Sequence, residues 1–87
     1  GLMYRDSLGD NSGIFYDYVD GGFWMDNVKF PIEMVFINDD EIVEIIKAKA
    51  YDKKSISPSV ESNGNLEVND GFCDNNNISI GNKVYRS

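Results

Sequence analysis

The chain has 87 residues, which is enough for one domain near the lower size limit of unaided folding. Hydrophobic residues make up 41% of the sequence and aromatic residues 13%, so the composition supports a packed core and argues against disorder. A net charge of −7 disfavours nucleic acid and anionic membrane surfaces as partners, and the absence of histidine excludes Ser-His-Asp and Cys-His catalysis and histidine-ligated zinc.

The N-terminal third predicts short elements separated by polar turns. Residues 1–8 are compatible with one helical turn that ends at the Gly- and Asn-rich stretch 9–13. Residues 13–19 are aromatic and β-branched, which predicts a strand. After Asp20-Gly21-Gly22, residues 23–25 begin a second extended segment. No stretch approaches the roughly eighteen apolar residues of a membrane-spanning helix, so we expect no membrane insertion.

A hairpin is predicted in the middle of the chain. Residues 32–37 form a strand whose side chains point alternately to opposite faces. Asn38-Asp39-Asp40 is typical of a tight turn, because Asn and Asp tolerate the left-handed backbone conformation. Residues 41–50 also fit helical spacing, but the short connection and the β-branched content favour a return strand. Its alternation slips at Ile45–Ile46, which predicts a β-bulge there.

The C-terminal third combines a polar loop with further short elements. Residues 51–64 predict a long polar excursion, and residues 65–68 a short strand. Asp70 is a candidate N-cap for a helical turn that reaches Asn75. Residues 78–85 predict two short extended pieces joined by a Gly-Asn turn.

Together these elements predict one domain over residues 1–87 with a mainly β (α+β) fold. The expected architecture is a small antiparallel, partly open β-barrel or sandwich with one or two short helices. Cys73 is the single cysteine, so an intrachain disulfide is excluded. No cationic residue adjoins Cys73, so it is predicted to be a small buried hydrophobe rather than a nucleophile. The acidic clusters lack calcium-loop spacing, and we expect no metal or other cofactor.

Four motifs follow one another along the chain in the order and spacing of a known family. Gly1-Leu2-Met3-Tyr4-Arg5 resembles an opening Gly-Leu-Met-x-Arg, and residues 23–27 resemble Phe-Trp-Met-Lys-Asn. Residues 31–36 are similar to Pro-Leu-Asp-Met-Val-Phe. Residues 66–71 and 78–84 are similar to a closing Leu-Glu-Val-x-x-Gly and Ile-x-x-Gly-Asp-x-Val. The chain therefore resembles the DUF192 family, a domain of unknown function, over nearly its whole length.

The resemblance implies a compact, mainly β fold with small helical additions, and it supplies no established catalytic or binding residues. Members often follow a secretory or lipoprotein leader, so the resemblance suggests an extracytoplasmic or secreted location. Members usually have a strand before the Gly-Leu-Met segment, and this sequence begins inside that motif, so we expect this strand to be missing. Three features depart from the pattern: Asp26 replaces a usual Lys and reverses the local charge, Glu33 replaces Asp, and residues 52–57 lack the cysteine that many members carry after the central hairpin.

Trp24, Asn27 and Glu33 form the best candidate ligand site. A small polar ligand such as a sugar would stack on the indole and accept or donate hydrogen bonds at the two polar side chains. In the structural alternative, which is favoured, Trp24 fills the core, Asn27 supplies a turn bond and Glu33 accepts backbone N–H groups. Asp26 adds a carboxylate beside this group, and Arg5 is predicted to pair with a carboxylate such as Glu33 or Glu67.

Three functions are compatible with these residues. The favoured one is a non-catalytic binding or accessory domain with a shallow polar and aromatic pocket around Trp24, for a small polar ligand or a protein partner. The second is a hydrolase acting on a small or sugar-like substrate through two of the carboxylates Asp26, Glu33 and Glu67. The third is a structural component of a larger assembly, such as a viral one, with an open strand edge for pairing.

Overall fold

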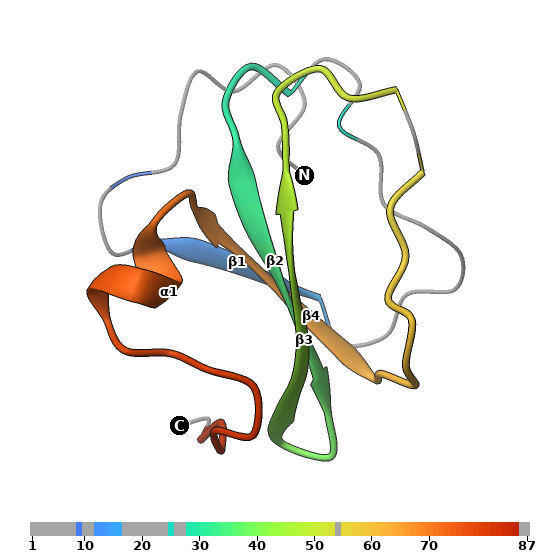
Figure 1. Ribbon diagram of the computed structural model, residues 1–87, viewed down its shortest axis with the longest axis vertical. Helices are drawn as coiled ribbons and strands as arrows, with labels where there is room; N and C mark the ends of the chain where they lie inside the picture. The colour runs from blue at the N-terminus through green and yellow to red at the C-terminus, as the bar shows by residue number, and fades with distance from the viewer. Residues whose placement is uncertain (1–8, 10–11, 17–24, 26–27, 54, 86–87) are drawn as a thin grey trace.

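The computed structural model describes residues 9, 12–16, 25, 28–53 and 55–85 (Figure 1). Within them, four antiparallel strands form one open sheet and a single short helix lies to one side of it. The elements are β1 (Gly13–Tyr16), β2 (Ile32–Asn38), β3 (Glu41–Ala48), β4 (Gly64–Asn69) and α1 (Phe72–Asn75), and the order across the sheet is β1-β4-β2-β3. The prediction of a mainly β, antiparallel, partly open fold with a short helix is confirmed.

Strand β2 is paired with β4 at one edge and with β3 at the other. Side chains pack above and below it, so it is buried on both faces. Met34 and Phe36 belong to one hydrophobic cluster, on what we call the first face of the sheet. Val35 and Ile37 belong to the other cluster, on the second face. The predicted alternation of residues 32–37 is therefore confirmed, and each face of the sheet has its own core.

The predicted turn between β2 and β3 is also confirmed. Asp39 and Asp40 both have positive φ angles, 49° and 64°, the combination that a two-residue type I′ hairpin requires. Asn63 fastens the following loop to this turn: its amide donates to the Asp39 carboxylate at 3.1 Å, and its carbonyl oxygen accepts the Asp39 N–H at 3.2 Å.

The β-bulge lies two residues before the predicted position. The register between β2 and β3 shifts after Phe36 and leaves Val43 as the extra residue. The prediction at Ile45–Ile46 is wrong because those residues alternate normally, one opposite Val35 on the second face and the other opposite Met34 on the first. The alternation instead breaks at Val43 and Glu44. Val43 packs against the first-face cluster, and Glu44 is paired with Phe36 of the same cluster, so two successive residues share a face, as they do in a bulge.

Helix α1 lies on the second face, where Cys73 and Phe72 join the cluster around Val35. The predicted Asp70 cap is wrong: Gly71 occupies the N-cap position, with a φ of 87°, and no capping side chain there forms a hydrogen bond. A positive φ is easy for glycine, which has no Cβ. The first helical N–H groups find an acceptor elsewhere, on β2, as described below.

Residues 78–85 cross the second face as an irregular segment, not as the two extended pieces that the sequence predicts. One isolated bridge, between Glu41 and Lys83, is the only β pairing described for this segment. Gly81, with a φ of 94°, turns the chain within it. Backbone hydrogen bonds still hold it against the hairpin, from Gly81 N–H to Ile42 at 2.8 Å and from Val84 N–H to Asp40 at 2.7 Å.

Several predicted elements lie outside the described residues, namely the helical turn at 1–8, the segment 23–24 and the end of the strand predicted over 13–19. The described part of that strand, Gly13–Tyr16, is β1. The long polar loop and the strand at residues 65–68 are confirmed, the latter within β4. In the described part of the chain, no helix is long and apolar enough to cross a membrane.

Candidate functional site

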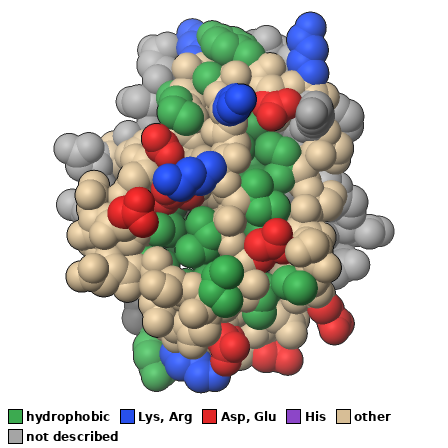
Figure 2. Space-filling view, viewed as in Figure 1, with side chains coloured by type: hydrophobic (Ala, Val, Ile, Leu, Met, Phe, Trp, Pro, Cys, Tyr) green, Lys and Arg blue, Asp and Glu red, His purple; other side chains and the backbone are tan. Residues whose placement is uncertain are grey.

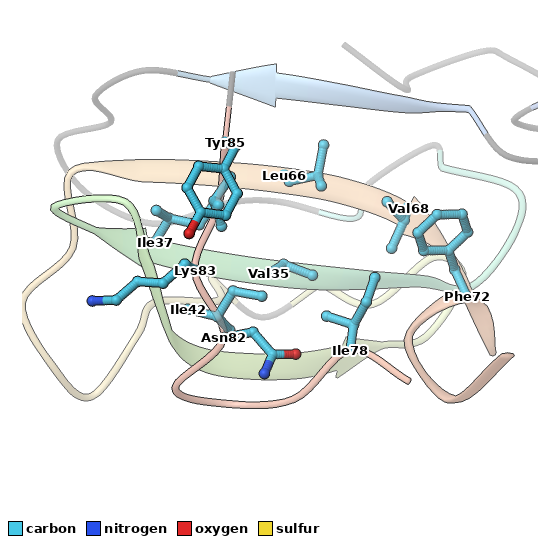
Figure 3. Close-up of a pocket in the computed structure, with 11 residues that line it drawn as sticks. Val35, Ile37, Ile42, Leu66, Val68, Phe72, Ile78, Asn82, Lys83 and Tyr85 are labelled. Atoms are coloured by element: carbon cyan, nitrogen blue, oxygen red, sulfur yellow. The ribbon is translucent and has the colours of Figure 1, made fainter. Parts of the chain in front are cut away.

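An apolar pocket of about 270 Å³ lies on the second face of the sheet, beneath the C-terminal segment (Figure 3). Its floor consists of side chains from the two central strands, Val35 and Ile37 on β2 and Leu66 and Val68 on β4. These residues share a face because Val35 is paired with Leu66 in the register of the two strands. The sheet therefore presents a continuous aliphatic floor to whatever lies above it.

The walls of the pocket come from residues that are distant from the floor in sequence. Phe72 of α1 and Ile78 close one end, and Asn82, Lys83 and Tyr85 come from the segment that crosses the sheet (Figure 3). Because that segment is held by backbone hydrogen bonds to the hairpin, the wall has a defined position.

Charge is kept out of the pocket interior. The Lys83 amine points away from the floor residues and donates to the Glu41 carboxylate at 2.8 Å (Figure 3). This hydrogen bond and the negative charge of Glu41 raise the pKa of Lys83. The side chain of Tyr85 is 90% exposed at the rim. On the face seen in Figure 2, hydrophobic side chains run through the middle with acidic and basic groups around them. Such a pocket suits an apolar guest.

Glu33 also lies on the second face, and it caps the helix. Its carboxylate accepts the backbone N–H of Cys73 at 2.9 Å and that of Gly71 at 3.0 Å, and the side chain is 1% exposed. Lys47 lies 3.8 Å from the same carboxylate. Burial alone would raise the pKa of Glu33, but the hydrogen bonds from Cys73 and Gly71 and the charge of Lys47 outweigh it and lower the pKa.

Cys73 is 4% exposed. Burial, followed by the hydrogen bond and charge of Glu33, raises the pKa of its thiol to about 12. A thiol with this pKa stays protonated at neutral pH and is a poor nucleophile. The prediction that Cys73 is a small buried hydrophobe is therefore confirmed.

Asn65 and Glu67 of β4 lie on the first face, opposite the pocket. Their exposed fractions are 2% and 5%. In the sheet register Glu67 is paired with Met34 and Ile14, both of which belong to the first-face cluster. Burial raises the pKa of Glu67 to about 7. Within the described part of the chain, neither the side-chain nitrogen nor the side-chain oxygen of Asn65 has a hydrogen-bond partner.

Four of the predicted ligand-binding residues, Arg5, Trp24, Asp26 and Asn27, lie outside the described residues. Glu33 is described, and its geometry is that of the structural alternative, with both carboxylate oxygens engaged at the start of α1. Its ligand-binding role stays a prediction. Among the described residues, no group of three or more His, Cys, Asp or Glu side chains could hold a metal ion.

Neither the apolar pocket nor the burial of Asn65 and Glu67 was predicted from the sequence. The alternation in β2 was a usable signal for the pocket floor, because it placed Val35 and Ile37 on one face. The alternation of Asn65 and Glu67 with Leu66 and Val68 was a signal for a strand with one polar face, but polar alternation usually marks a solvent-exposed face.

Comparison with known proteins identifies similar solved structures. Among curated proteins, none matches this chain. A crystal structure of a protein of unknown function from Novosphingobium aromaticivorans is 31% identical, with a TM-score of 0.88, and the match covers 99% of this chain and 65% of that one. A crystal structure of a proposed transcription regulator from Sinorhizobium meliloti is 28% identical, with a TM-score of 0.86, over 95% of this chain and 68% of that one.

These matches show the same fold in longer proteins, since the chain spans less than two thirds of the Novosphingobium protein. The model of the DUF192 family, described as an uncharacterized ACR, matches residues 1–85. The motifs, the sheet and this match agree, and the chain belongs to the DUF192 family.

Proposed function

We propose that this domain is a non-catalytic binding module that takes a small apolar molecule in the second-face pocket. The observation that carries the proposal is the aliphatic floor of a pocket of about 270 Å³. A cavity of about 150 Å³ lined by Leu, Ile and Phe is already large enough to bind benzene in another protein. A guest somewhat larger than one aromatic ring fits this volume, and burying its apolar surface contributes about 25 cal/mol per Å².

The described ionisable groups support binding over catalysis. Cys73 is buried and protonated at neutral pH, and the carboxylate of Glu33 is engaged with backbone N–H groups. A hydrolase that used Glu33 and Glu67 would need both carboxylates on one substrate. Glu33 is paired with Val68 on the second face, whereas Glu67 is paired with Met34 on the first, so the sheet itself separates them. This separation disfavours the hydrolase alternative for that pair.

The polar pocket around Trp24 stays a prediction, and so does an extracytoplasmic location. A titration of the intrinsic fluorescence of Trp24 against a set of sugars tests that pocket, because Trp24 is the only tryptophan. The Sinorhizobium protein is named as a proposed transcription regulator, but a net charge of −7 repels the phosphate backbone of DNA and disfavours DNA binding by this chain.

Methyl-resolved NMR of the intact chain with benzene as the probe tests the apolar pocket. We expect benzene to shift the methyl resonances of Ile37, Leu66 and Val68 in a saturable way. Leu66→Phe should fill the pocket and weaken binding at least several-fold. Val60→Phe is the matched control, since Val60 is 47% exposed and does not line the pocket. Floor methyl resonances that stay fixed up to the solubility limit of benzene would contradict the proposal.

A further inference from the structure

Strand β4 carries two buried polar side chains, Asn65 and Glu67, on the first face of the sheet. Asn65 and Glu67 are two residues apart on one strand, so their Cα atoms are about 7 Å apart and their side chains project from the same face. Phe36 and Met34 are their respective neighbours on β2. Two polar groups thus stand among apolar ones, near the middle of a four-stranded sheet.

The amide of Asn65 is an exception among the polar side chains that the structure describes. Asn63 is bonded to Asp39, and the Asn82 side chain accepts the Ser79 N–H at 2.8 Å. Glu33, equally buried, accepts two backbone N–H groups. By contrast, both polar atoms of the Asn65 side chain are shielded from solvent and have no hydrogen-bond partner among the residues that the structure describes. An unpaired buried amide costs free energy in the folded protein, so its retention calls for a reason.

Glu67 adds to the same feature. It is 5% exposed, and no described side chain forms a salt bridge with it. Replacing Asn65 by an aliphatic residue would extend the apolar first-face cluster without the loss of a hydrogen bond among the described residues. The enclosed Asn65 amide and the neighbouring Glu67 carboxyl group therefore present unused hydrogen-bonding capacity on one face of β4.

We infer that Asn65 and Glu67 hold a small, neutral, polyhydroxylated molecule on the first face. An amide offers a donor and an acceptor, and a carboxyl group offers an acceptor and, when protonated, a donor. Neighbouring hydroxyl groups both donate and accept, so two of them can satisfy both side chains together. A metal cation would use only the oxygens and leave the Asn65 nitrogen unpaired, and an anion would be repelled by Glu67 when that group is ionised.

This site is independent of the apolar pocket, because the two lie on opposite faces of the sheet. The side chains alternate along β4: Leu66 and Val68 line the pocket, while Asn65 and Glu67 point the other way. One strand therefore supplies matched variants for both sites. Since the amide of Asn65 is enclosed, a ligand enters only when the packing around it yields, and we expect slow association.

The experiment follows the Asn65 side-chain amide by ¹⁵N–¹H NMR in the intact chain, with glycerol, D-ribose and D-glucose as separate probes. We expect at least one probe to move the two amide proton resonances in a saturable way. Asn65→Leu should weaken that binding at least tenfold while benzene binding persists. Leu66→Phe should do the reverse, weakening benzene binding and keeping the response to the hydroxylated probe.

A stability measurement separates a ligand-holding residue from a structural one. If Asn65 holds a ligand, Asn65→Leu removes an unpaired amide, and the Tm of the ligand-free protein should stay unchanged or rise. If Asn65 is structural, the Tm should fall. Asn65→Ala serves as the second variant if the larger side chain does not fit. Amide resonances unmoved by all three probes, or a crystal structure grown with them in which only an ordered water meets Asn65 and Glu67, would overturn the inference.

Discussion

Glu33 and Cys73 are joined across 40 positions of the sequence, because the Glu33 carboxylate accepts the backbone N–H of Cys73 at 2.9 Å. Its second oxygen accepts the N–H of Gly71 at 3.0 Å. The first N–H groups of any helix have no partner within the helix. In this fold the central strand β2 supplies that partner, so one buried carboxylate connects the sheet to α1 and positions Phe72 at the end of the pocket.

Glu33→Gln should therefore destabilise the fold although it preserves the size of the side chain. The substitution removes the charge and puts an amide N–H₂ in place of one acceptor, facing backbone donors. Hydrogen bonds to charged groups contribute roughly 1.5–3 kcal/mol, and we expect a loss of that order in the free energy of unfolding, measured with urea. Glu44→Gln is the control, since Glu44 accepts the Ser59 N–H at 2.7 Å at an exposed position and should cost at most about 1 kcal/mol. Equal losses would contradict the capping role.

The stability of the protein should fall as the pH rises from about 4.5 to about 7. Burial raises the pKa of Glu67 to about 7 from a usual value of 4.5. Between these values the folded state binds more protons than the unfolded state, so the free energy of unfolding decreases with rising pH. The lowered pKa of Glu33 acts in the opposite direction, because its stabilisation is lost as the pH falls below 4.5.

Urea unfolding at several pH values measures this dependence, and Glu67→Gln is the diagnostic variant. The neutral amide cannot ionise. The free energy of unfolding of this variant should therefore fall less between about pH 4.5 and pH 7 than that of the parent protein, by as much as about 3 kcal/mol. The loss of stability below pH 4.5 should remain, because it belongs to Glu33. A profile that is unchanged in Glu67→Gln would show that Glu67 titrates normally.

The sequence was sufficient where local rules decide the structure. The alternation of residues 32–37 correctly predicted which side chains lie on each face of the sheet. The Asn-Asp-Asp sequence correctly predicted a turn, in which Asp39 and Asp40 have left-handed backbone angles. The lone cysteine was correctly predicted to be buried. In each case neighbouring residues alone carry the information, since strand periodicity and turn chemistry are local properties.

The sequence was insufficient where distant residues decide the structure. The cap of α1 was assigned to Asp70, the nearest polar side chain, but the acceptor is Glu33 in another element. Residues 78–85 alternate like a strand, yet the hairpin gives them only one bridge, at Lys83. The pocket combines β2, β4, α1 and this segment, so its existence depends on tertiary contacts that no local pattern contains.

Cys73 should resist thiol reagents in the folded protein and react once the protein unfolds. Burial and the neighbouring Glu33 raise its pKa to about 12, so the thiol stays protonated near pH 8. Labelling with iodoacetamide, followed by mass spectrometry, should be slow in buffer and fast in urea. Because Cys73 is the only cysteine, every adduct reports on this site. Rapid stoichiometric labelling of the folded chain would contradict the buried, protonated assignment.

Asp40→Gly should stabilise the hairpin between β2 and β3. Asp40 has a φ of 64°, a conformation that costs an L-residue up to about 1 kcal/mol and that glycine adopts freely. The Asp40 carbonyl that accepts the Val84 N–H is retained, and one negative charge is removed from an acidic chain. We expect a rise of a few degrees in Tm, measured by circular dichroism.

Asp39→Gly is the matched control. Glycine also adopts the φ of 49° at this position without strain, but the substitution removes the hydrogen bond between the Asp39 carboxylate and Asn63. The gain should therefore be smaller there, and an equal rise in both variants would show that the hydrogen bond between Asn63 and the Asp39 carboxylate does not stabilise the turn.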